Sequence, residues 1–298
     1  MWVHLNGRLV EESRARLSVF DRGFLYGDGI FESMRAVGGV VFRERRHLER
    51  LGRSADGIGL VLPMPASGFS AAVRELLDRN RLTDARIRIT VTRGEGRPGD
   101  YVESQGPPSV VIAVARFDGL DPTLHRNGVR VVIAHRQQIP PEALDPAIKS
   151  ISRLGSVLAR REARGGGAFE AILLDGEGNL TEGTVSNLFL VLGGRLRTSP
   201  APAGGLPGIT RAAVAELARA ASVGFSEERL PARLLETADE VFLTNTTWEV
   251  LPVVEVDGRP VGTGVPGPVA RGLLARYREL VHLECSAGAA GRGREARR

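Results

Sequence analysis

One amine stands out among the residues that could do chemistry. Lys149, in the stretch DPAIKSISRLG, is the only lysine of the 298-residue chain, and the other 39 of its 40 Lys+Arg residues are arginine. Arginine is effectively always protonated, whereas lysine can lose its proton when its surroundings lower its pKa. Only a deprotonated amine attacks a carbonyl group to form a Schiff base. Composition alone leaves two interpretations open, a reactive amine or a stray surface residue. The proline-rich loop that leads Lys149 to the start of a helix favours the reactive amine.

A second stretch, GGLPGITR (204–211), is a glycine-rich loop that enters a helix. The first backbone N–H groups of such a helix, here those of Ile209 and Thr210, have no intrahelical partner and suit a phosphate group. An ordinary capped helix explains the same letters, and by itself this motif favours that simpler interpretation.

Two further stretches carry polar groups between predicted strands. Glu182, in NLTEGTVSNLFLV (179–191), could pair with a protonated ring nitrogen, or be an exposed acid in a turn. Thr246 and Thr247, in LTNTTWEV (243–250), could donate hydrogen bonds to a phosphate or carboxylate, or simply stabilise a turn.

Several classes of protein are disfavoured by what the sequence lacks. Cys285 is the single cysteine and the five histidines are scattered, so we expect neither a disulfide within the chain nor a metal site. No apolar run approaches the length of a membrane span, and the start lacks the pattern of a signal peptide. A cytoplasmic protein is the simplest interpretation.

The net charge of +5 does not indicate nucleic-acid binding. Much of it comes from the last residues, 286–298, and elsewhere basic side chains alternate with acidic ones, as in FRERRHLERLGR. No zinc-finger spacing and no basic stripe with aromatic residues is present. A basic binding protein without a cofactor therefore stays only a remote alternative.

The order of predicted elements indicates an α+β protein with two domains. Strands are predicted at 2–11, 29–42, 85–94 and 109–117, and helices at 45–60 and near 67–79. The turn-rich stretch 118–128 suggests a boundary, so residues 1–120 form a small domain and 121–285 a larger one. A helix near 266–281 ends the fold, and residues 286–298 are predicted to be a disordered basic tail.

Taken together, these stretches resemble the class IV (fold type IV) pyridoxal-phosphate enzymes, which include branched-chain and D-amino acid aminotransferases and aminodeoxychorismate lyase. The resemblance spans about residues 3–281. It rests on the order of DRGFLYGDGIFESMRA, HLERL, IKSISRLGSVLARREA, LTEGTVSNLF, GITR and TNTTWEVLPVVEVDG. It implies a small α+β domain followed by a larger, barrel-like cofactor-binding domain.

The resemblance also implies a role for each residue. Lys149 would hold pyridoxal 5′-phosphate as a Schiff base and move a proton during transamination, Glu182 would pair with the pyridine nitrogen, and Leu206 would pack on the ring. The phosphate group would be bound by Arg50, Ile209, Thr210 and Thr246 or Thr247. The substrate would be faced by Tyr26, Phe31 and Arg35, with Arg88 and Arg97 as candidates for binding its carboxylate.

The implied activity is transfer of an amino group between a small amino acid, branched-chain-like or D-, and a 2-oxo acid. Lyase activity is the main alternative, because Arg153 follows Lys149 by four residues as in the lyases, whereas GITR and TNTTWEV are similar to the transaminases. Family members are usually homodimers, so the resemblance implies a homodimer.

Overall fold

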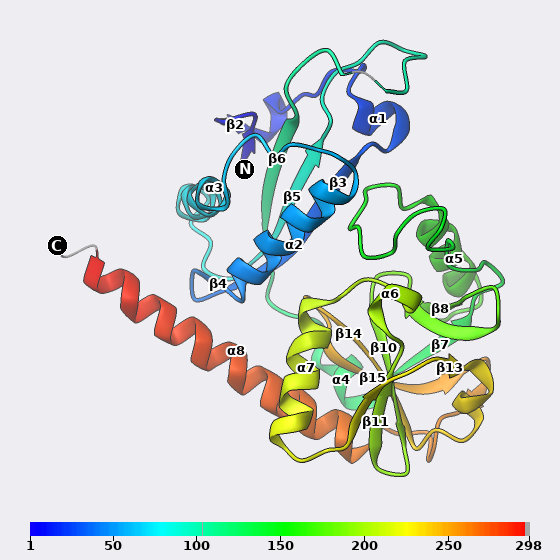
Figure 1. Ribbon diagram of the computed structural model, residues 1–298. Coiled ribbons are helices and arrows are strands. Elements are labelled where there is room, and N and C mark those ends of the chain that lie inside the picture. The colour runs from blue at the N-terminus through cyan, green and yellow to red at the C-terminus, as the bar shows by residue number, and fades with distance from the viewer. Residues whose placement is uncertain (103, 296–298) are drawn as a thin grey trace. The chain divides into compact units, whose positions relative to one another are not determined.

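The computed structural model describes residues 1–102 and 104–295, and the chain divides into two compact units (Figure 1). The first unit contains Met1–Asp118, Ile148–Ser152 and the chain from Val281 onward. The second contains Gly119–Ala147 and Arg153–Leu280. The short segment that holds Lys149 therefore groups with the first unit, although the sequence analysis placed it inside 121–285.

The first unit is built on an antiparallel sheet with the strand order β2-β1-β6-β5-β3-β4. Figure 1 shows helices α2 and α3 lying beside this sheet. Its elements are β1 Trp2–Leu5, β2 Arg8–Glu11, the 3-10 helix η1 Glu12–Arg14, α1 Arg22–Tyr26, β3 Gly29–Val37, β4 Val40–Val41, α2 Glu44–Gly57, α3 Ala66–Arg79, β5 Ala85–Thr92 and β6 Ser109–Arg116.

Alternation along the strands gives this sheet one apolar face and one polar face. In β5, Ile87 and Ile89 are buried, whereas Arg86 and Arg88 are exposed. The apolar face packs in one core with the buried side chains of α2 and α3, among them Leu51. Because side chains alternate between faces, a residue's position along a strand decides whether it joins the core or the open face.

The second unit has a larger mixed sheet with helices outside it, of which α7 contacts β14 and α5 contacts β8. Its elements are α4 Pro122–Asn127, β7 Val129–Ile133, α5 Leu154–Gly165, β8 Glu170–Leu174, β9 Asn179–Gly183, β10 Asn187–Leu192, β11 Arg195–Thr198, α6 Ala201–Gly204, α7 Ile209–Ala220, β12 Phe225–Glu227, β13 Leu230–Pro231, the 3-10 helix η2 Ala232–Glu236, β14 Glu240–Asn245, β15 Glu249–Val256 and β16 Arg259–Pro260.

The larger sheet closes on itself and is barrel-like. Its strands follow the order β10-β14-β15-β7-β8-β9, and β9 pairs again with β10. The closing pair joins Glu182 to Asn187. The predicted α+β class, with a barrel-like second part, is thereby confirmed. The seam of the barrel falls on a residue that the sequence analysis had selected for its chemistry.

The last helix, α8 Pro268–Glu295, is much longer than the helix predicted near 266–281. Helix α8 continues to Glu295, into the stretch from residue 286 for which a disordered tail was predicted. Residues 296–298 lie outside the described residues. Across the described part of the chain, no helix has both the length and the apolar character that a membrane crossing requires.

Two short helices escaped the sequence analysis because they are too short to show a helical period. Helix α1 begins after Asp21, whose carboxylate accepts a hydrogen bond from the Gly23 N–H. Helix α4 begins at Pro122 after Asp121, whose carboxylate accepts from the Thr123 N–H. Both follow the usual rule for helix N-termini, in which an aspartate side chain satisfies a free backbone donor.

Candidate active site

Lys149 lies in a segment that adds to the edge of the first unit's sheet. The Phe31 N–H donates to the Lys149 carbonyl at 2.9 Å, and the Ile151 N–H donates to the Gly29 carbonyl at 3.0 Å. The Lys149 N–H in turn donates to the Ser54 hydroxyl of α2 at 3.0 Å. The backbone of Lys149 is therefore fixed from two sides, which suits a side chain that must be positioned.

The amine of Lys149 meets two other predicted residues on the open face of the sheet. Its Nζ atom lies 4.7 Å from the centre of the Phe31 ring, and the Arg88 guanidinium lies 3.9 Å from the same ring. Arg88 also donates from Nε to the Thr90 hydroxyl at 3.2 Å. Thr90 is the register partner of Phe31, so all four side chains gather at one end of β3 and β5. This grouping places the amine of Lys149 and the guanidinium of Arg88 beside one aromatic ring.

Arg50 takes part in a buried cluster of charges on the opposite face of β3 from Phe31. Its Nε and Nη2 atoms bond both carboxylate oxygens of Glu32, at 2.7 and 2.8 Å. His47 donates from Nδ1 to the same carboxylate at 2.8 Å. All three side chains are 3% exposed or less, so the guanidinium is held in one orientation.

The cluster shifts the pKa values of its members. Burial raises the pKa of the Glu32 carboxyl, but the Arg50 charge and the hydrogen bonds from Arg50 and His47 outweigh it, so the pKa lies well below its usual range. Burial lowers the pKa of His47, and the charges of Arg50 and Lys149 add to that effect against the opposing pull of Glu32. Glu32 is therefore a carboxylate and His47 is neutral at neutral pH.

The remaining predicted residues of the first unit are not part of this grouping. The Tyr26 hydroxyl accepts from the Gly99 N–H at 2.9 Å, so Tyr26 is tied to the loop after β5. Arg97 is exposed in that loop. Arg35 shares the open face of β3 with Phe31, and its guanidinium lies 5.4 Å from the Phe117 ring. Their roles toward a substrate stay predictions.

In the second unit, Glu182 is buried and held by neutral donors. Its Oε2 atom accepts from the Leu206 N–H at 2.9 Å and lies 3.4 Å from the Asn187 amide nitrogen. Its Oε1 atom accepts from the Gln138 amide at 3.3 Å. Asn187 also donates to the Leu206 carbonyl at 2.8 Å, which ties the loop 204–208 to the carboxylate. The backbone of Leu206 thus lies against the Glu182 carboxylate, and their roles toward a cofactor ring stay predictions.

Glycines allow the loop 204–208 to approach this carboxylate. A Cβ atom on Gly205, whose φ is +154°, would lie 2.5 Å from Glu182 Oε2, and one on Gly208 would lie 2.0 Å from Asn187 Oδ1. Gly208 precedes α7, and no side chain caps that helix. The first turn of α7, with the buried residues Ile209 and Thr210, therefore presents backbone N–H groups that suit an anion.

Thr246 and Thr247 lie in the turn between β14 and β15, which Asn245 organises. The Asn245 side-chain oxygen accepts from the N–H groups of Thr247 and Trp248 and from the Thr247 hydroxyl. The Thr247 hydroxyl is thus already committed to the turn. Of the two predicted phosphate ligands, Thr246 is the better candidate for a side-chain contact.

Sequence reasoning missed the residues that orient the predicted ones. Glu32 could have been found, because it is a charged residue at a core position of β3 and a buried charge needs a partner. Asn187 could also have been found, because an antiparallel pairing of 179–191 brings it opposite Glu182. Asn245 falls within the polar turn LTNTTWEV, where its contacts with Thr247 and Trp248 are local. Nothing in the sequence indicates Gln138, since its contact with Glu182 depends on how distant segments meet.

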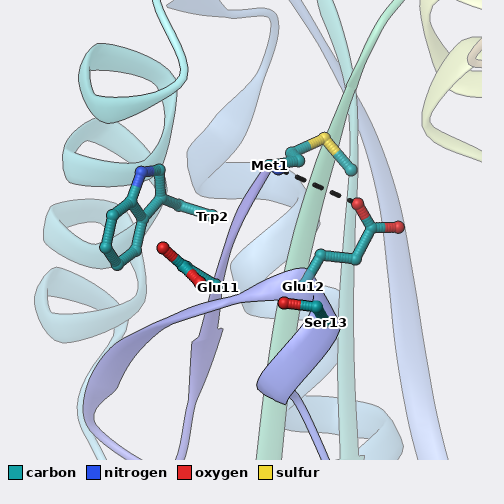
Figure 2. Close-up of a pocket in the computed structure, with 5 residues that line it drawn as sticks. All are labelled: Met1, Trp2, Glu11, Glu12 and Ser13. Carbon is teal, nitrogen blue, oxygen red and sulfur yellow. Dashed lines mark ion pairs between the residues drawn. The ribbon is translucent and has the colours of Figure 1, made fainter.

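A pocket of about 400 Å³ lies at the N-terminus, and none of these residues lines it. Figure 2 shows its lining, which consists of Met1, Trp2, Glu11, Glu12 and Ser13. The Met1 amino group and Glu12 form an ion pair there at 3.9 Å. Within the described residues, no group of three or more His, Cys, Asp and Glu side chains is arranged to hold a metal ion.

Comparisons with known proteins identify the class of this chain. A family model described as amino-transferase class IV matches residues 29–256. A putative branched-chain-amino-acid aminotransferase of Methanocaldococcus jannaschii is 40% identical, over 94% of this chain and 96% of its own. A D-alanine aminotransferase of Bacillus licheniformis is 34% identical, over 95% and 98%. The chain belongs to the amino-transferase class IV family, whose members use pyridoxal 5′-phosphate.

Solved structures agree with this assignment. The T.th. branched-chain amino acid aminotransferase with pyridoxamine 5′-phosphate matches with a TM-score of 0.90 at 31% identity, covering 94% of this chain and 93% of that one. The 4-amino-4-deoxychorismate lyase of Pseudomonas aeruginosa matches with a TM-score of 0.82 at 29% identity, covering 93% and 98%. Two of the three kinds of enzyme that the sequence resembles, a branched-chain aminotransferase and a lyase, are thus similar to this chain in fold.

Proposed function

We propose that this chain is a pyridoxal-phosphate-dependent aminotransferase that moves an amino group between a small amino acid and a 2-oxo acid. The observation that carries the proposal is the placement of the only lysine, whose amine lies against Phe31 beside the guanidinium of Arg88. The Glu182 carboxylate, which its donors fix, fits a protonated ring nitrogen, and the uncapped start of α7 fits the phosphate of the cofactor. When bound, the cofactor supplies an aldehyde for the amine and a ring that accepts electrons from the substrate.

Lys149 would then have two tasks, and each other residue one. Lys149 holds the cofactor covalently through Nζ, and the same atom carries the proton to and from the substrate's α-carbon. Glu182 keeps the ring nitrogen protonated, because its carboxylate favours a positive charge beside it. The first turn of α7, Thr246 and the Arg50 guanidinium oriented by Glu32 bind the phosphate.

Attachment at Lys149 can be tested by light absorption and by mass. Wild-type protein mixed with pyridoxal phosphate is expected to absorb in the visible, and borohydride reduction should leave the cofactor's mass on the peptide that contains residue 149. Lys149→Arg keeps the charge but cannot form the bond, so it is the matched control. A wild-type protein that stays unmodified under these conditions would refute the proposal.

Arg88 is proposed to bind the substrate carboxylate, since a guanidinium can hold a carboxylate with two hydrogen bonds. Arg88→Met should raise the KM for the 2-oxo acid about tenfold or more, the usual worth of a hydrogen bond to a charged group. Arg86→Met is the control, because Arg86 is an exposed arginine on the same face of β5, two residues away. Equal effects of both substitutions would remove Arg88 from this role.

The names of two relatives, a branched-chain-amino-acid and a D-alanine aminotransferase, narrow the range of amino acids to test as amino donors. Both classes are small apolar amino acids that differ at the α-carbon, so the stereochemistry of the donor is the deciding property. A screen of L- and D-amino acids with 2-oxoglutarate and with pyruvate, followed by detection of the keto-acid product, tests the proposal directly.

Lyase activity is a second candidate because of Arg153, four residues after Lys149, and because the lyase structure from Pseudomonas aeruginosa shares the fold. Arg153 donates to the Thr184 carbonyl, which fixes its side chain near the turn after Glu182. Release of pyruvate from aminodeoxychorismate without any amino acceptor would decide for the lyase. Dependence of product formation on a 2-oxo acid would decide for the transaminase.

We further propose that the chain is a homodimer, supported by a set of exposed apolar side chains around α1 and the loop after β5. Phe24 is 75% exposed, Tyr101 73% and Val102 77%. The two segments are in contact, because Tyr26 of α1 packs against Tyr101 with ring centres 4.9 Å apart. A second copy of the chain would remove this apolar area from water.

Light scattering after size-exclusion chromatography tests this arrangement. Phe24→Glu is expected to give a monomer, whereas Val61→Glu, at a residue 82% exposed after α2, should leave the dimer intact. A wild-type mass of one chain would exclude the dimer. The cytoplasmic location, inferred from the absence of a membrane-span run and a signal-peptide pattern and from the single cysteine, stays a prediction.

A further inference from the structure

The turn after Glu182 lies at the seam of the barrel, where backbone pairing is sparse. Strands β9 and β10 share one register pair, Glu182 with Asn187, and the Gly183 N–H donates to the Ser186 carbonyl at 2.7 Å. Strands pinned by so few backbone bonds depend on side chains for their register. The position of Glu182 is therefore sensitive to whatever holds residues 184–186.

A carboxylate with no part in the proposed chemistry holds this turn. Glu170, at the start of β8, is fully buried, and its Oε1 atom accepts from the Thr184 hydroxyl at 2.5 Å. Its Oε2 atom accepts from Arg160 Nη1 at 3.0 Å and lies 3.4 Å from the Ser186 hydroxyl. Burial raises the pKa of Glu170, and the Arg160 charge and the Thr184 hydrogen bond oppose that rise.

The same contacts connect two turns that carry proposed cofactor ligands. The Arg160 guanidinium lies 5.0 Å from the centre of the Trp248 ring, and Trp248 follows Thr246 and Thr247. Asn245, which organises that turn, donates to the Val185 carbonyl at 3.1 Å. Glu170 therefore reaches one turn directly and is tied to the other through Arg160.

We propose that Glu170 is a positioning residue that fixes the turn 184–186, with Arg160 as its partner, and so aims the Glu182 carboxylate at the cofactor's ring nitrogen. The inference rests on the proposed function, since it concerns the same cofactor. Groups behind the contacting residues commonly decide how well a site is organised, because a small displacement of a charged group weakens its interaction. Glu170 acts only through Glu182 and touches no reacting atom.

Two probes separate positioning from general stability. Protein freed of cofactor is titrated with pyridoxal phosphate and with its carbocyclic analogue, in which a C–H group replaces the ring nitrogen, and binding is followed by quenching of tryptophan fluorescence. Glu170→Gln should raise the Kd for pyridoxal phosphate about tenfold, the effect of losing a hydrogen bond to a charged group. The Kd for the analogue should change less than twofold, because no ring nitrogen is there to be aimed at.

The matched control is Glu240→Gln. Glu240 is also a buried carboxylate of the second unit, but it accepts from the N–H groups of Val269 and Ala270 at the start of α8. The Glu240→Gln variant should lower the melting temperature as Glu170→Gln does. It should leave the Kd for pyridoxal phosphate and the Kd for the analogue unchanged. Thr184→Val removes only the hydroxyl that bonds Glu170 and should raise the Kd for pyridoxal phosphate about threefold, so it gives a reading even if Glu170→Gln fails to fold.

The outcomes are distinct. A loss of affinity that depends on the ring nitrogen in Glu170→Gln and Thr184→Val, but not in Glu240→Gln, supports the inference. Equal losses for both probes, or no loss for either, overturn it. A wild-type protein that binds neither probe contradicts the proposed function itself, so the two failures are distinguishable.

Discussion

The two groups of candidate residues are held in place by different forces. In the first unit, Glu32 locks Arg50 through a buried ion pair, and His47 completes the cluster. In the second unit, Glu182 is held by a backbone N–H group and neutral amides, and glycines clear the space around it. The first group therefore depends on a counter-charge, whereas the second depends on neutral hydrogen bonds and on the space that glycines leave. Removing a charge should disrupt the first group, and adding a side-chain atom should disrupt the second.

The largest effect is expected from breaking the buried ion pair. Glu32→Gln leaves the Arg50 charge buried without a counter-charge and should lower the free energy of unfolding by about 3–5 kcal/mol. Urea unfolding at pH 7 measures this loss. Glu12→Gln, which removes an exposed carboxylate paired with the N-terminus, serves as the control and should change little. A loss near that of the control would show that charge does not hold the first group.

A smaller effect is expected from filling the space beside Glu182. Gly205→Ala adds a Cβ atom 2.5 Å from Glu182 Oε2 at a positive φ, so it should cost about 1–3 kcal/mol and weaken cofactor binding. Gly194→Ala is the matched control, because Gly194 also has a positive φ but has open space where its Cβ would be. Equal losses in both variants would mean that backbone strain, and not the fit around Glu182, is responsible.

The pH dependence of the free energy of unfolding should distinguish the two halves of the molecule. One titrating group can change that free energy by no more than about 1.4 kcal/mol for each step of one in pH. His47 has a pKa below its ordinary 6.5, so the unfolded chain binds more protons and stability falls as the pH drops through 6.5. Glu32 has a pKa below 4.5, so its stabilisation is lost as the pH falls below 4.5. Glu170 has a raised pKa, so its contribution has the opposite sign and is lost as the pH rises above 4.5.

Denaturant midpoints between about pH 2 and pH 8 check these signs. His47→Gln should flatten the curve around pH 6.5, whereas Glu170→Gln should leave that region unchanged and steepen the decline toward acid. An unchanged slope around pH 6.5 in His47→Gln would show that His47 is not the group that titrates there.

The smallest effect is expected from removing the hydrogen bond between the Lys149 N–H and the Ser54 hydroxyl. Ser54→Ala removes the acceptor of the Lys149 N–H and should cost about 1 kcal/mol. It should also increase amide hydrogen exchange at residues 149–151 while leaving exchange in β5 unchanged. Unaltered exchange at Lys149 would show that the sheet edge alone holds the segment.

The strands and longer helices were predictable because their apolar residues recur with periods of two and of three to four. The alternation in β5 and the spacing of Leu48, Leu51 and Ala55 in α2 are examples. The residues selected for chemistry could be chosen because reactive or polar groups in such patterns are uncommon. The residues that orient them could not all be predicted. Gln138, for example, lies 44 residues from Glu182 in the sequence and contacts it only in the folded chain. Likewise, nothing in the sequence pairs Ser150 with Ile30.

The segment that carries Lys149 has a second consequence. It covers the start of β3, where Ile30 pairs with Ser150, and so occupies backbone groups that an open strand edge would offer to other chains. Release of this segment would uncover an apolar edge able to recruit further strands. Displacement of Lys149 and exposure of an open strand edge should therefore occur together.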